Sequence, residues 1–261
     1  MMLWSQSDLV KATAGDLIGD WRNGGIAGVS IDSRSIKSDE LFVAVKAKRD
    51  GHSFINDAIR LGAKGALVDH IPADIPSNTP LLLVPSVQEA LENLGKYRRE
   101  RSQAKLVAIT GSVGKTSSKN MLKTILELQG KTHASPASFN NYLGVPLTLA
   151  NLPIDATYAV VEIGMNKPGE IEPLARMTSA DVVLITAIGK AHLEAFGDIA
   201  GIAHEKAQIV KGLKSGGIAV LNADTPGYEI LKKQTIKNGS QFISFGGIDG
   251  NLRAKKMQKL N

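Results

Sequence analysis

The sequence predicts an α/β protein in which a small α/β domain precedes a larger domain built on a mostly parallel sheet. Three observations lead to this prediction. Strand-like apolar segments alternate with helical ones through most of the chain. A segment rich in proline, "HIPADIPSNTP" (70–80), separates the first part from the rest. A glycine turn directly follows an apolar strand near residue 110. The 261 residues suffice for two domains, which we place at 1–84 and 85–261.

The first domain contains short elements of both kinds. Ser7 is a plausible cap for a helix over "SDLVKATAGD" (7–16). Apolar alternation or apolar runs indicate strands, and helical spacing that ends at glycine indicates a second helix. The predicted elements are strands at 28–34, 40–45 and 66–69 and a helix at 54–65.

The second domain shows regular strand–helix alternation, which indicates a parallel sheet with helices on both faces. Ligands of such sheets gather at the carboxyl ends of the strands. The predicted strands are 106–110, 157–163, 181–186, 217–221 and 241–245.

Composition excludes several classes of protein. Hydrophobic residues make up 43% and charged residues 21%, the balance of a globular protein. The chain has no cysteine, which excludes disulfides and thiolate metal sites. It has neither a signal-peptide pattern nor an apolar run of about 20 residues, so we expect a cytoplasmic protein without membrane insertion.

The net charge of +6 does not indicate nucleic-acid binding. Part of the excess lies in "RRER" (98–101) and part in the terminal "RAKKMQKLN" (253–261). Aromatic residues make up only 5%, and no stripe of alternating aromatic and basic residues is present for stacking bases. We therefore expect no nucleic-acid partner.

The segment "LVAITGSVGKTSSKNML" (106–122) is a candidate phosphate-binding loop. An apolar strand leads into a glycine turn, and a helix with Met121, Leu122, Ile125 and Leu126 on one face follows. Only two residues separate Gly111 from Gly114, so the loop is shorter than the common P-loop. The alternative is a Gly-Ser turn that precedes a solvated lysine. The candidate nucleotide-binding residues are Thr110, Gly111, Ser112, Val113, Gly114, Lys115, Thr116 and Ser117.

The residue types of this loop suit a polyphosphate. Glycines let the backbone approach the anion, and free N–H groups at the start of a helix point toward it. Lys115 can reach the β- and γ-phosphates of ATP, and the Thr116 hydroxyl can bind Mg²⁺. The sequence therefore predicts a P-loop-type sheet with ATP and Mg²⁺ as cofactors.

Three further residues are candidates for the same site. Glu162 ends an apolar strand, where a buried carboxylate requires a cation or hydrogen-bond partners, although it could instead point to water. His192 follows the next strand, where it could be either a ligand or an ordinary surface histidine. Lys206 lies on the apolar stripe of a helix, where it either extends its ammonium group outward or takes part in chemistry.

The loop "TGSVGKTS" (110–117) resembles that of the Mur ligase family. Three further segments extend the resemblance: "NNYLGVPLTLANL" (140–152), "EIGMNKPGEI" (162–171) and "ITAIGKAHLEAFG" (185–197). Within the family they are similar to the ligases that join D-alanyl-D-alanine to UDP-N-acetylmuramoyl-tripeptide through an acyl phosphate. The resemblance implies an ATP-dependent amide ligase of peptidoglycan synthesis.

The resemblance also implies roles for particular residues. Thr116 and Glu162 would hold one Mg²⁺ and His192 a second, with Asn140 and Asn141 near the nucleotide or the sugar substrate. The implied catalytic residues are Lys115, Glu162, His192 and Lys206, and the last is carbamylated in some members of the family.

The first domain resembles the family's UDP-sugar-binding domain. Ser33 and Arg34 would meet the uridine diphosphate, Arg34 through charge-assisted hydrogen bonds. Asp50, Gly51 and His52 resemble the family's Asp-Gly-His turn. From residue types alone, both segments could be ordinary polar turns.

The family's third domain, which follows a Gly-x-His-Asn segment, is absent from this sequence. We therefore expect a monomer that binds nucleotide and UDP-sugar but ligates poorly or not at all. A binding module without turnover is the main alternative. A P-loop ATPase or switch protein and a folylpolyglutamate-type ligase fit the N-terminal domain less well.

Overall fold

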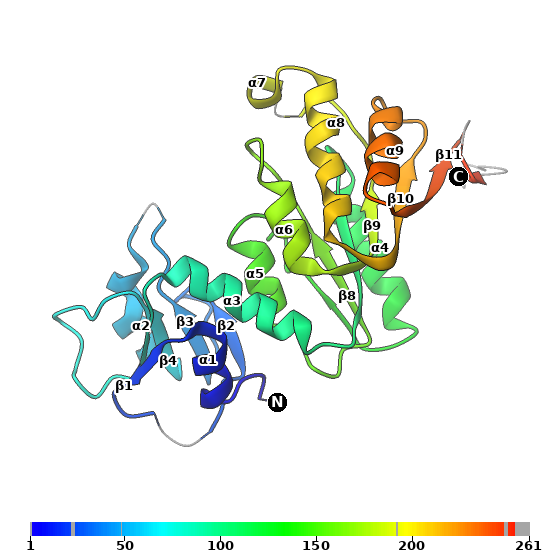
Figure 1. The fold of residues 1–261 in the computed structure, drawn as a ribbon. Coiled ribbons are helices and arrows are strands. Elements are labelled where there is room, and N and C mark those ends of the chain that lie inside the picture. The colour runs from blue at the N-terminus through cyan, green and yellow to red at the C-terminus, as the bar shows by residue number, and fades with distance from the viewer. Residues whose placement is uncertain (1, 22–23, 48, 192, 248–249, 254–261) are drawn as a thin grey trace, which may run out of the picture. The chain divides into compact units, whose positions relative to one another are not determined.

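The computed structural model describes residues 2–21, 24–47, 49–191, 193–247 and 250–253 and divides the chain into two compact units (Figure 1). The first unit extends to Ser102 and includes residues 146–154, and the second comprises the remainder. In these described ranges, no helix is both long enough and apolar enough to cross a bilayer.

The first unit is a five-stranded sheet with helices. Its strand order is β1-β5-β4-β3-β2, in which β1 is antiparallel to β5 and the other pairs are parallel. The elements are α1 (Gln6–Thr13), β1 (Asp16–Ile18), β2 (Gly28–Ser30), β3 (Glu40–Val43), the 3-10 helix η1 (Gly51–Phe54), α2 (Ile55–Arg60), β4 (Gly65–Val68), β5 (Leu81–Leu83) and α3 (Val87–Glu100). Helix α1 begins earlier than expected, because the hydroxyl of Ser5, not that of Ser7, accepts the Asp8 N–H at 3.0 Å.

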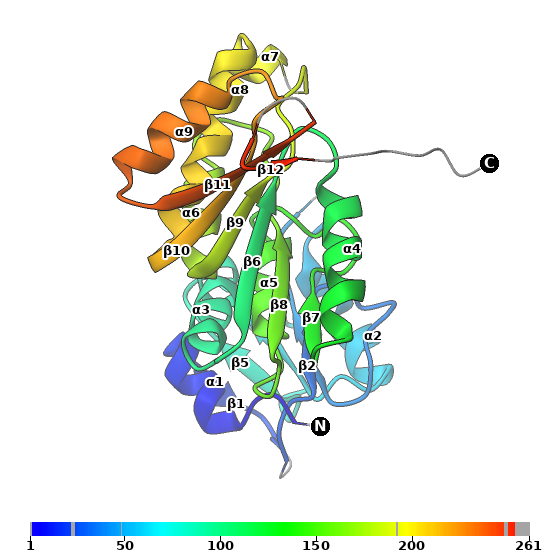
Figure 2. The ribbon, with the colours of Figure 1, turned by 90° about the vertical axis from the view of Figure 1, so that its right-hand side faces the viewer.

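The second unit is a seven-stranded parallel sheet of order β12-β11-β10-β9-β6-β8-β7. Figure 2 shows α4 on one face of this sheet and α6, α8 and α9 on the other, which confirms the predicted fold class. The elements of this unit are β6 (Lys105–Thr110), α4 (Lys115–Glu127), β7 (Thr132–Ala134), β8 (Tyr158–Glu162), α6 (Ile171–Thr178), β9 (Ala180–Ile185), α7 (Leu193–Phe196), α8 (Ile199–Ala207), the 3-10 helix η2 (Gln208–Gly212), β10 (Leu213–Asn222), α9 (Tyr228–Lys237), β11 (Gln241–Gly246) and β12 (Leu252–Arg253). Helix α5 (Gly144–Ala150) begins in the second unit and lies mostly in the segment 146–154 of the first unit.

Helix α3 belongs to the first unit, whereas the sequence suggested a division at residue 84. Its Tyr97 hydroxyl donates to Asp8 Oδ1 at 2.7 Å, and Arg98 Nε donates to the Leu152 carbonyl at 2.9 Å. The buried indole of Trp4 donates to the carbonyl of Ala150 at 3.0 Å. These long-range bonds join α3 to α1 and to residues 146–154, and join the latter to Trp4 near the N-terminus.

Helix α4 has an unusual distribution of exposed residues. Met121 and Ile125 are 68% and 59% exposed, although the sequence placed them on one apolar face of the helix with Leu122 and Leu126. Leu122 and Leu126 are half-buried instead. Lys119 is the one fully buried residue of this helix, all of which the structure describes.

Strand β2 is an edge strand, and the side chain of Asn151 pairs with it. Asn151 Oδ1 accepts the Val29 N–H, and Asn151 Nδ2 donates to the Val29 carbonyl, both at 2.8 Å. One side chain therefore satisfies both backbone groups of a buried residue. This pairing protects part of the free edge of the sheet.

We expect Asn151→Ala to lower the free energy of unfolding of the first unit by about 2–4 kcal/mol, because two buried backbone groups lose their partners. Urea unfolding followed by tryptophan fluorescence measures this directly, since both tryptophans, Trp4 and Trp21, lie in the first unit. Asn56→Ala, on an exposed position of α2, is the matched control and should change stability little. Equal effects of the two substitutions would contradict the edge-pairing role.

Candidate functional site

The phosphate loop connects β6 to α4 through two glycines with special backbone requirements. Gly114 has φ of +83° and caps α4, a conformation that favours glycine. A Cβ at Gly111 would lie 1.9 Å from the Thr186 hydroxyl, so no side chain fits there. The loop is therefore a tight turn that places the first N–H groups of α4 at the carboxyl edge of the sheet.

Residues after β9 hold this loop in place. The Thr186 hydroxyl lies 2.6 Å from the Val113 carbonyl, to which it can donate. The Ser112 hydroxyl accepts the Gly189 N–H at 2.9 Å. Thr110 Oγ1 is buried and makes no hydrogen bond within the described part of the chain. The loop thus has a rigid base, while the side chain of Val113 is exposed.

Lys115 begins α4 and turns its ammonium group back over the loop. Its Nζ donates to the Gly111 carbonyl at 2.8 Å. Burial lowers the pKa of Lys115 from its usual value, and the charge of Glu162 opposes this effect. A lysine here faces the space that a bound anion would take.

Glu162 ends β8 and is only 1% exposed, so it does not point to water. Its Oε2 accepts the Thr116 hydroxyl at 2.9 Å, and its Oε1 accepts Asn140 Nδ2 at 2.8 Å. A hydroxyl and a carboxylate at this distance are hard oxygen ligands of the kind that Mg²⁺ prefers. The residues present therefore fit a magnesium ion.

Lys206 on α8 reaches the same region. It is 2% exposed, so its ammonium group does not extend into solvent. Burial lowers the pKa of Lys206 to about 7, repulsion from Lys115 adds to this effect, and Glu205 opposes it. The amine is thus close to its point of deprotonation at neutral pH.

A small cavity of about 110 Å³ brings these groups together at the carboxyl edge of the sheet. Asn141 lines it and also stabilises its own turn, because Asn141 Oδ1 accepts the Gly144 N–H at 2.9 Å. The lining residues that concern the site are Gly111, Ser112, Lys115, Asn140, Asn141 and Lys206. Of the sequence candidates, the loop, both asparagines and both lysines therefore meet in one place.

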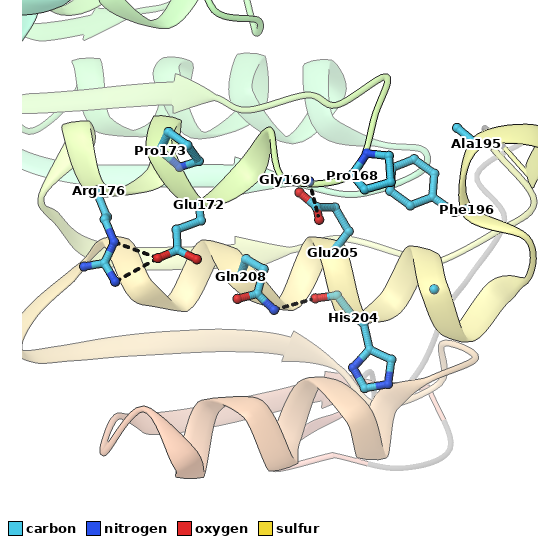
Figure 3. A pocket seen from close by; sticks show the side chains of 11 residues that line it. Pro168, Gly169, Glu172, Pro173, Arg176, Ala195, Phe196, His204, Glu205 and Gln208 are labelled. Carbon is cyan, nitrogen blue, oxygen red and sulfur yellow. Dashed lines mark hydrogen bonds and ion pairs between the residues drawn. The ribbon is translucent and has the colours of Figure 1, made fainter.

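Glu205 braces the loop between β8 and α6 next to this cavity. Its carboxylate accepts the N–H groups of Gly169 and Ile171, each at 2.9 Å. Figure 3 shows Glu205 directed at Gly169 beside a larger cavity of about 660 Å³ between α6, α7 and α8. Since Glu205 precedes Lys206, the same turn of α8 positions the loop and the buried amine.

His192, the candidate for a second metal ion, lies outside the described residues. Ser117, also predicted to face the nucleotide, lies on α4 with an exposed side chain.

The candidate UDP-binding residues lie in the first unit. Arg34 forms a two-pronged ion pair with Asp32, with Nε–Oδ1 and Nη2–Oδ2 distances of 2.9 and 2.8 Å. This pair holds the pKa of Asp32 below its usual value. The Arg34 side chain is 82% exposed, and Ser33 is half-buried beside it. The guanidinium can therefore contact an anion.

The Asp-Gly-His turn forms the start of η1, where Asp50 accepts the His52 N–H at 3.0 Å. The buried His52 ring places Nδ1 2.6 Å from Asp50, while its Nε2 accepts the Asp69 N–H at 3.3 Å. His70 stacks on this ring at 4.0 Å. Both nitrogens of His52 are thus engaged, and stacked rings do not aim their lone pairs at one point. The cluster of Asp50, His52 and His70 therefore fixes the turn and is poorly arranged to bind a metal ion.

A glycine turn with a lysine after a parallel strand, beside a carboxylate on the next strand, defines a P-loop nucleotide-binding protein. Comparison with protein-family models identifies the family within this class. The Mur ligase middle domain matches residues 109–260, and the model described as Mur ligase family, catalytic domain matches residues 25–99. The chain belongs to the Mur ligase family, which confirms the resemblance inferred from the motifs.

Two curated relatives from different bacteria carry the same name. The UDP-N-acetylmuramoyl-tripeptide–D-alanyl-D-alanine ligase of Rickettsia prowazekii is 40% identical over 84% of this chain and 49% of its own length. The ligase of the same name from Escherichia coli is 41% identical over 75% of this chain and 43% of its own length. The chain thus spans about half the length of the curated relatives it matches.

Solved structures agree with this assignment. MurF from Acinetobacter baumannii has a TM-score of 0.84 and 32% identity, covering 98% of this chain and 56% of its own. MurF ligase from Thermotoga maritima in complex with ADP has a TM-score of 0.71 and 29% identity, covering 86% and 51%.

Two residues of the site were missed in the sequence. Lys119 lies four residues after Lys115, so the helical repeat places it on the same face of α4, and this spacing was an available signal. Glu205 had no such signal, because its partners are backbone groups more than thirty residues away, at sequence separations of 36 and 34.

We expect Lys206→Met to stabilise the protein more at pH 6 than at pH 9. The lowered pKa means that the folded state binds fewer protons than the unfolded state between about pH 7 and 10. The free energy of unfolding of the wild type therefore rises with pH in that window. Below the window Lys206 is charged in the folded state, and its burial destabilises the protein fully. Urea unfolding followed by far-UV circular dichroism at both pH values tests this. Lys123→Met, on an exposed position, should show no such pH dependence.

Proposed function

We propose that this chain forms the UDP-sugar-binding and ATP-binding parts of a ligase that joins D-alanyl-D-alanine to UDP-N-acetylmuramoyl-tripeptide in peptidoglycan synthesis. The observation that supports this most is the meeting of the phosphate loop, Asn140 and Lys206 around one cavity, with Glu162 hydrogen-bonded to Asn140. The shared name of relatives at about 40% identity supports the choice of substrates.

The proposal gives each group of the cavity a role. The N–H groups at the start of α4 and the ammonium of Lys115 bind the terminal phosphates of ATP. Thr116 and Glu162 would hold Mg²⁺, and the hydrogen bond between Thr116 Oγ1 and Glu162 Oε2 keeps these two oxygens together. Asn140 orients Glu162 by donating a hydrogen bond to the second carboxylate oxygen, Oε1. His192 as ligand of a second metal ion rests on the family resemblance alone.

The proposed chemistry uses positioning and neutralisation of charge. ATP supplies the γ-phosphoryl group that turns an unreactive carboxylate into an acyl phosphate, and ADP leaves. The amine of D-alanyl-D-alanine then forms the amide bond as phosphate departs and the nitrogen loses a proton. Lys115 and Lys206 place positive charge around the cavity in which phosphate oxygens gather, and the low pKa of Lys206 makes that charge sensitive to its surroundings. A water-excluded site strengthens these interactions.

The first unit supplies the proposed sugar-nucleotide site. Arg34 exchanges part of its pairing with Asp32 for a diphosphate oxygen, and Ser33 donates a hydrogen bond beside it. Asp50 and His52 hold the backbone turn at Gly51 in shape. Because the reaction uses ATP, we place it in the cytoplasm.

Phosphate release by the purified chain tests the function. Release that requires both UDP-N-acetylmuramoyl-tripeptide and D-alanyl-D-alanine assigns the ligase activity to this chain. Nucleotide binding without release assigns it the role of a binding module. Release that is indifferent to the UDP-sugar indicates a simple ATPase and contradicts the proposal.

We expect Lys115→Ala to weaken MgATP binding about ten-fold or more, equivalent to about 1.4 kcal/mol. The substitution removes the cation that faces the terminal phosphates. Isothermal titration calorimetry measures the affinity. Lys123→Ala removes a charge from an exposed position two turns along the same helix and is the control. Unchanged affinity for Lys115→Ala would contradict the nucleotide site.

A further inference from the structure

Lys119 occupies a position at which a charge is unfavourable for folding alone. It is 2% exposed and lies between the end of β8 and the loop that follows β7. Burying an ammonium group removes its hydration, and an apolar side chain of similar volume is often as stable or more stable at such a position. On the same helix Met121 and Ile125 are exposed. The placement of the charge therefore requires an explanation other than packing.

The contacts of Lys119 supply that explanation. Its Nζ lies 3.9 Å from Glu162 Oε2, in an ion pair whose side chains are 3% and 1% exposed. The same Nζ donates a short hydrogen bond to the Ala137 carbonyl. Thr116, one turn earlier on α4, contacts the same oxygen of Glu162. Two side chains of one helix thus hold a single carboxylate oxygen.

The loop contacted by Lys119 leads directly to Asn140. Ala137 has φ of +42°, a left-handed conformation that a residue with a side chain adopts only when its surroundings hold it. Ser135 Oγ accepts the Glu162 N–H at 3.1 Å, and Asn140 donates to Glu162 Oε1. Lys119 therefore lies between the carboxylate and the loop that carries its third partner.

We propose that Lys119 is a positioning residue, which orients the Glu162 carboxylate for a divalent cation and fixes the loop 135–141 beside the nucleotide. This inference rests on the proposed function, since the cation and nucleotide are those of the proposed ligase site. The Lys119 ammonium contacts the carboxylate that would hold the ion, so Lys119 acts through Glu162. Partners of this kind orient the groups that bind a metal and change its affinity when removed.

The test compares Lys119→Met with Lys123→Met, the same substitution one turn away at an exposed position. ADP affinity is measured by calorimetry with Mg²⁺ and with EDTA. We expect Lys119→Met to weaken ADP binding about ten-fold or more with Mg²⁺ and less than about two-fold with EDTA. Equal losses under both conditions would indicate a merely structural role. Stronger ADP binding by Lys119→Met with Mg²⁺ would indicate that the Lys119 ammonium competes with the metal ion for Glu162. Either result overturns the proposal.

A double-mutant cycle decides whether Lys119 acts through Glu162. In the Glu162→Gln background, Lys119→Met should cause no further loss of the Mg²⁺-dependent affinity. An additive loss contradicts the proposed route. Lys119→Arg, which keeps the charge, should recover part of the affinity if the altered chain folds.

Hydrogen exchange separates this inference from the proposed function. In the free protein, Lys119→Met should speed amide exchange in residues 135–141 and at Gly164, whose N–H donates to the Asn140 carbonyl, while α9 stays unchanged. If the wild type does not bind ADP, the proposed function fails and this measurement alone decides the positioning role. Unchanged exchange overturns it.

Discussion

The buried carboxylate of Glu162 is the interaction on which the site depends. Removing a carboxylate from water is unfavourable unless hydrogen bonds and positive charge replace its hydration. Here Thr116, Lys119 and Asn140 supply them, from a helix and a loop that both precede β8 in the sequence. Satisfying one charged group therefore aligns the start of α4, the end of β8 and the loop after β7 at the same edge of the sheet.

The balance of charge around this carboxylate suits an anion. Lys115, Lys119 and Lys206 face the region, while Glu162 and Glu205 are engaged with protein groups. Burial lowers the pKa values of both Lys115 and Lys206, and repulsion from Lys115 adds to the effect at Lys206. A polyphosphate brings the negative charge that offsets the unfavourable burial of these amines, which is the physical basis for proposing that the cavity binds the nucleotide.

Local sequence was a good guide wherever a contiguous segment determines the structure. The five predicted strands of the second sheet are present, and the turn 111–114 lies between a strand and a helix as its spacing indicates. The short strands β1, β5, β7 and β12 were not predicted, because each consists of two or three residues and depends on pairing with a distant neighbour. The placement of α3 in the first unit was missed for the same reason, because it depends on contacts with the distant residues Asp8 and Leu152.

By itself, the sequence determined the phosphate loop, its glycines, the strand-end position of Glu162 and the membership of the Mur ligase family. These features depend on residue types at short spacing along one segment. Only the tertiary structure decided that Glu162 is buried, that Lys206 is enclosed beside Lys115, and that Lys119 contacts both a carboxylate and a loop. Burial and electrostatic coupling depend on the groups that surround a residue in space, and here those groups come from segments far apart in the chain.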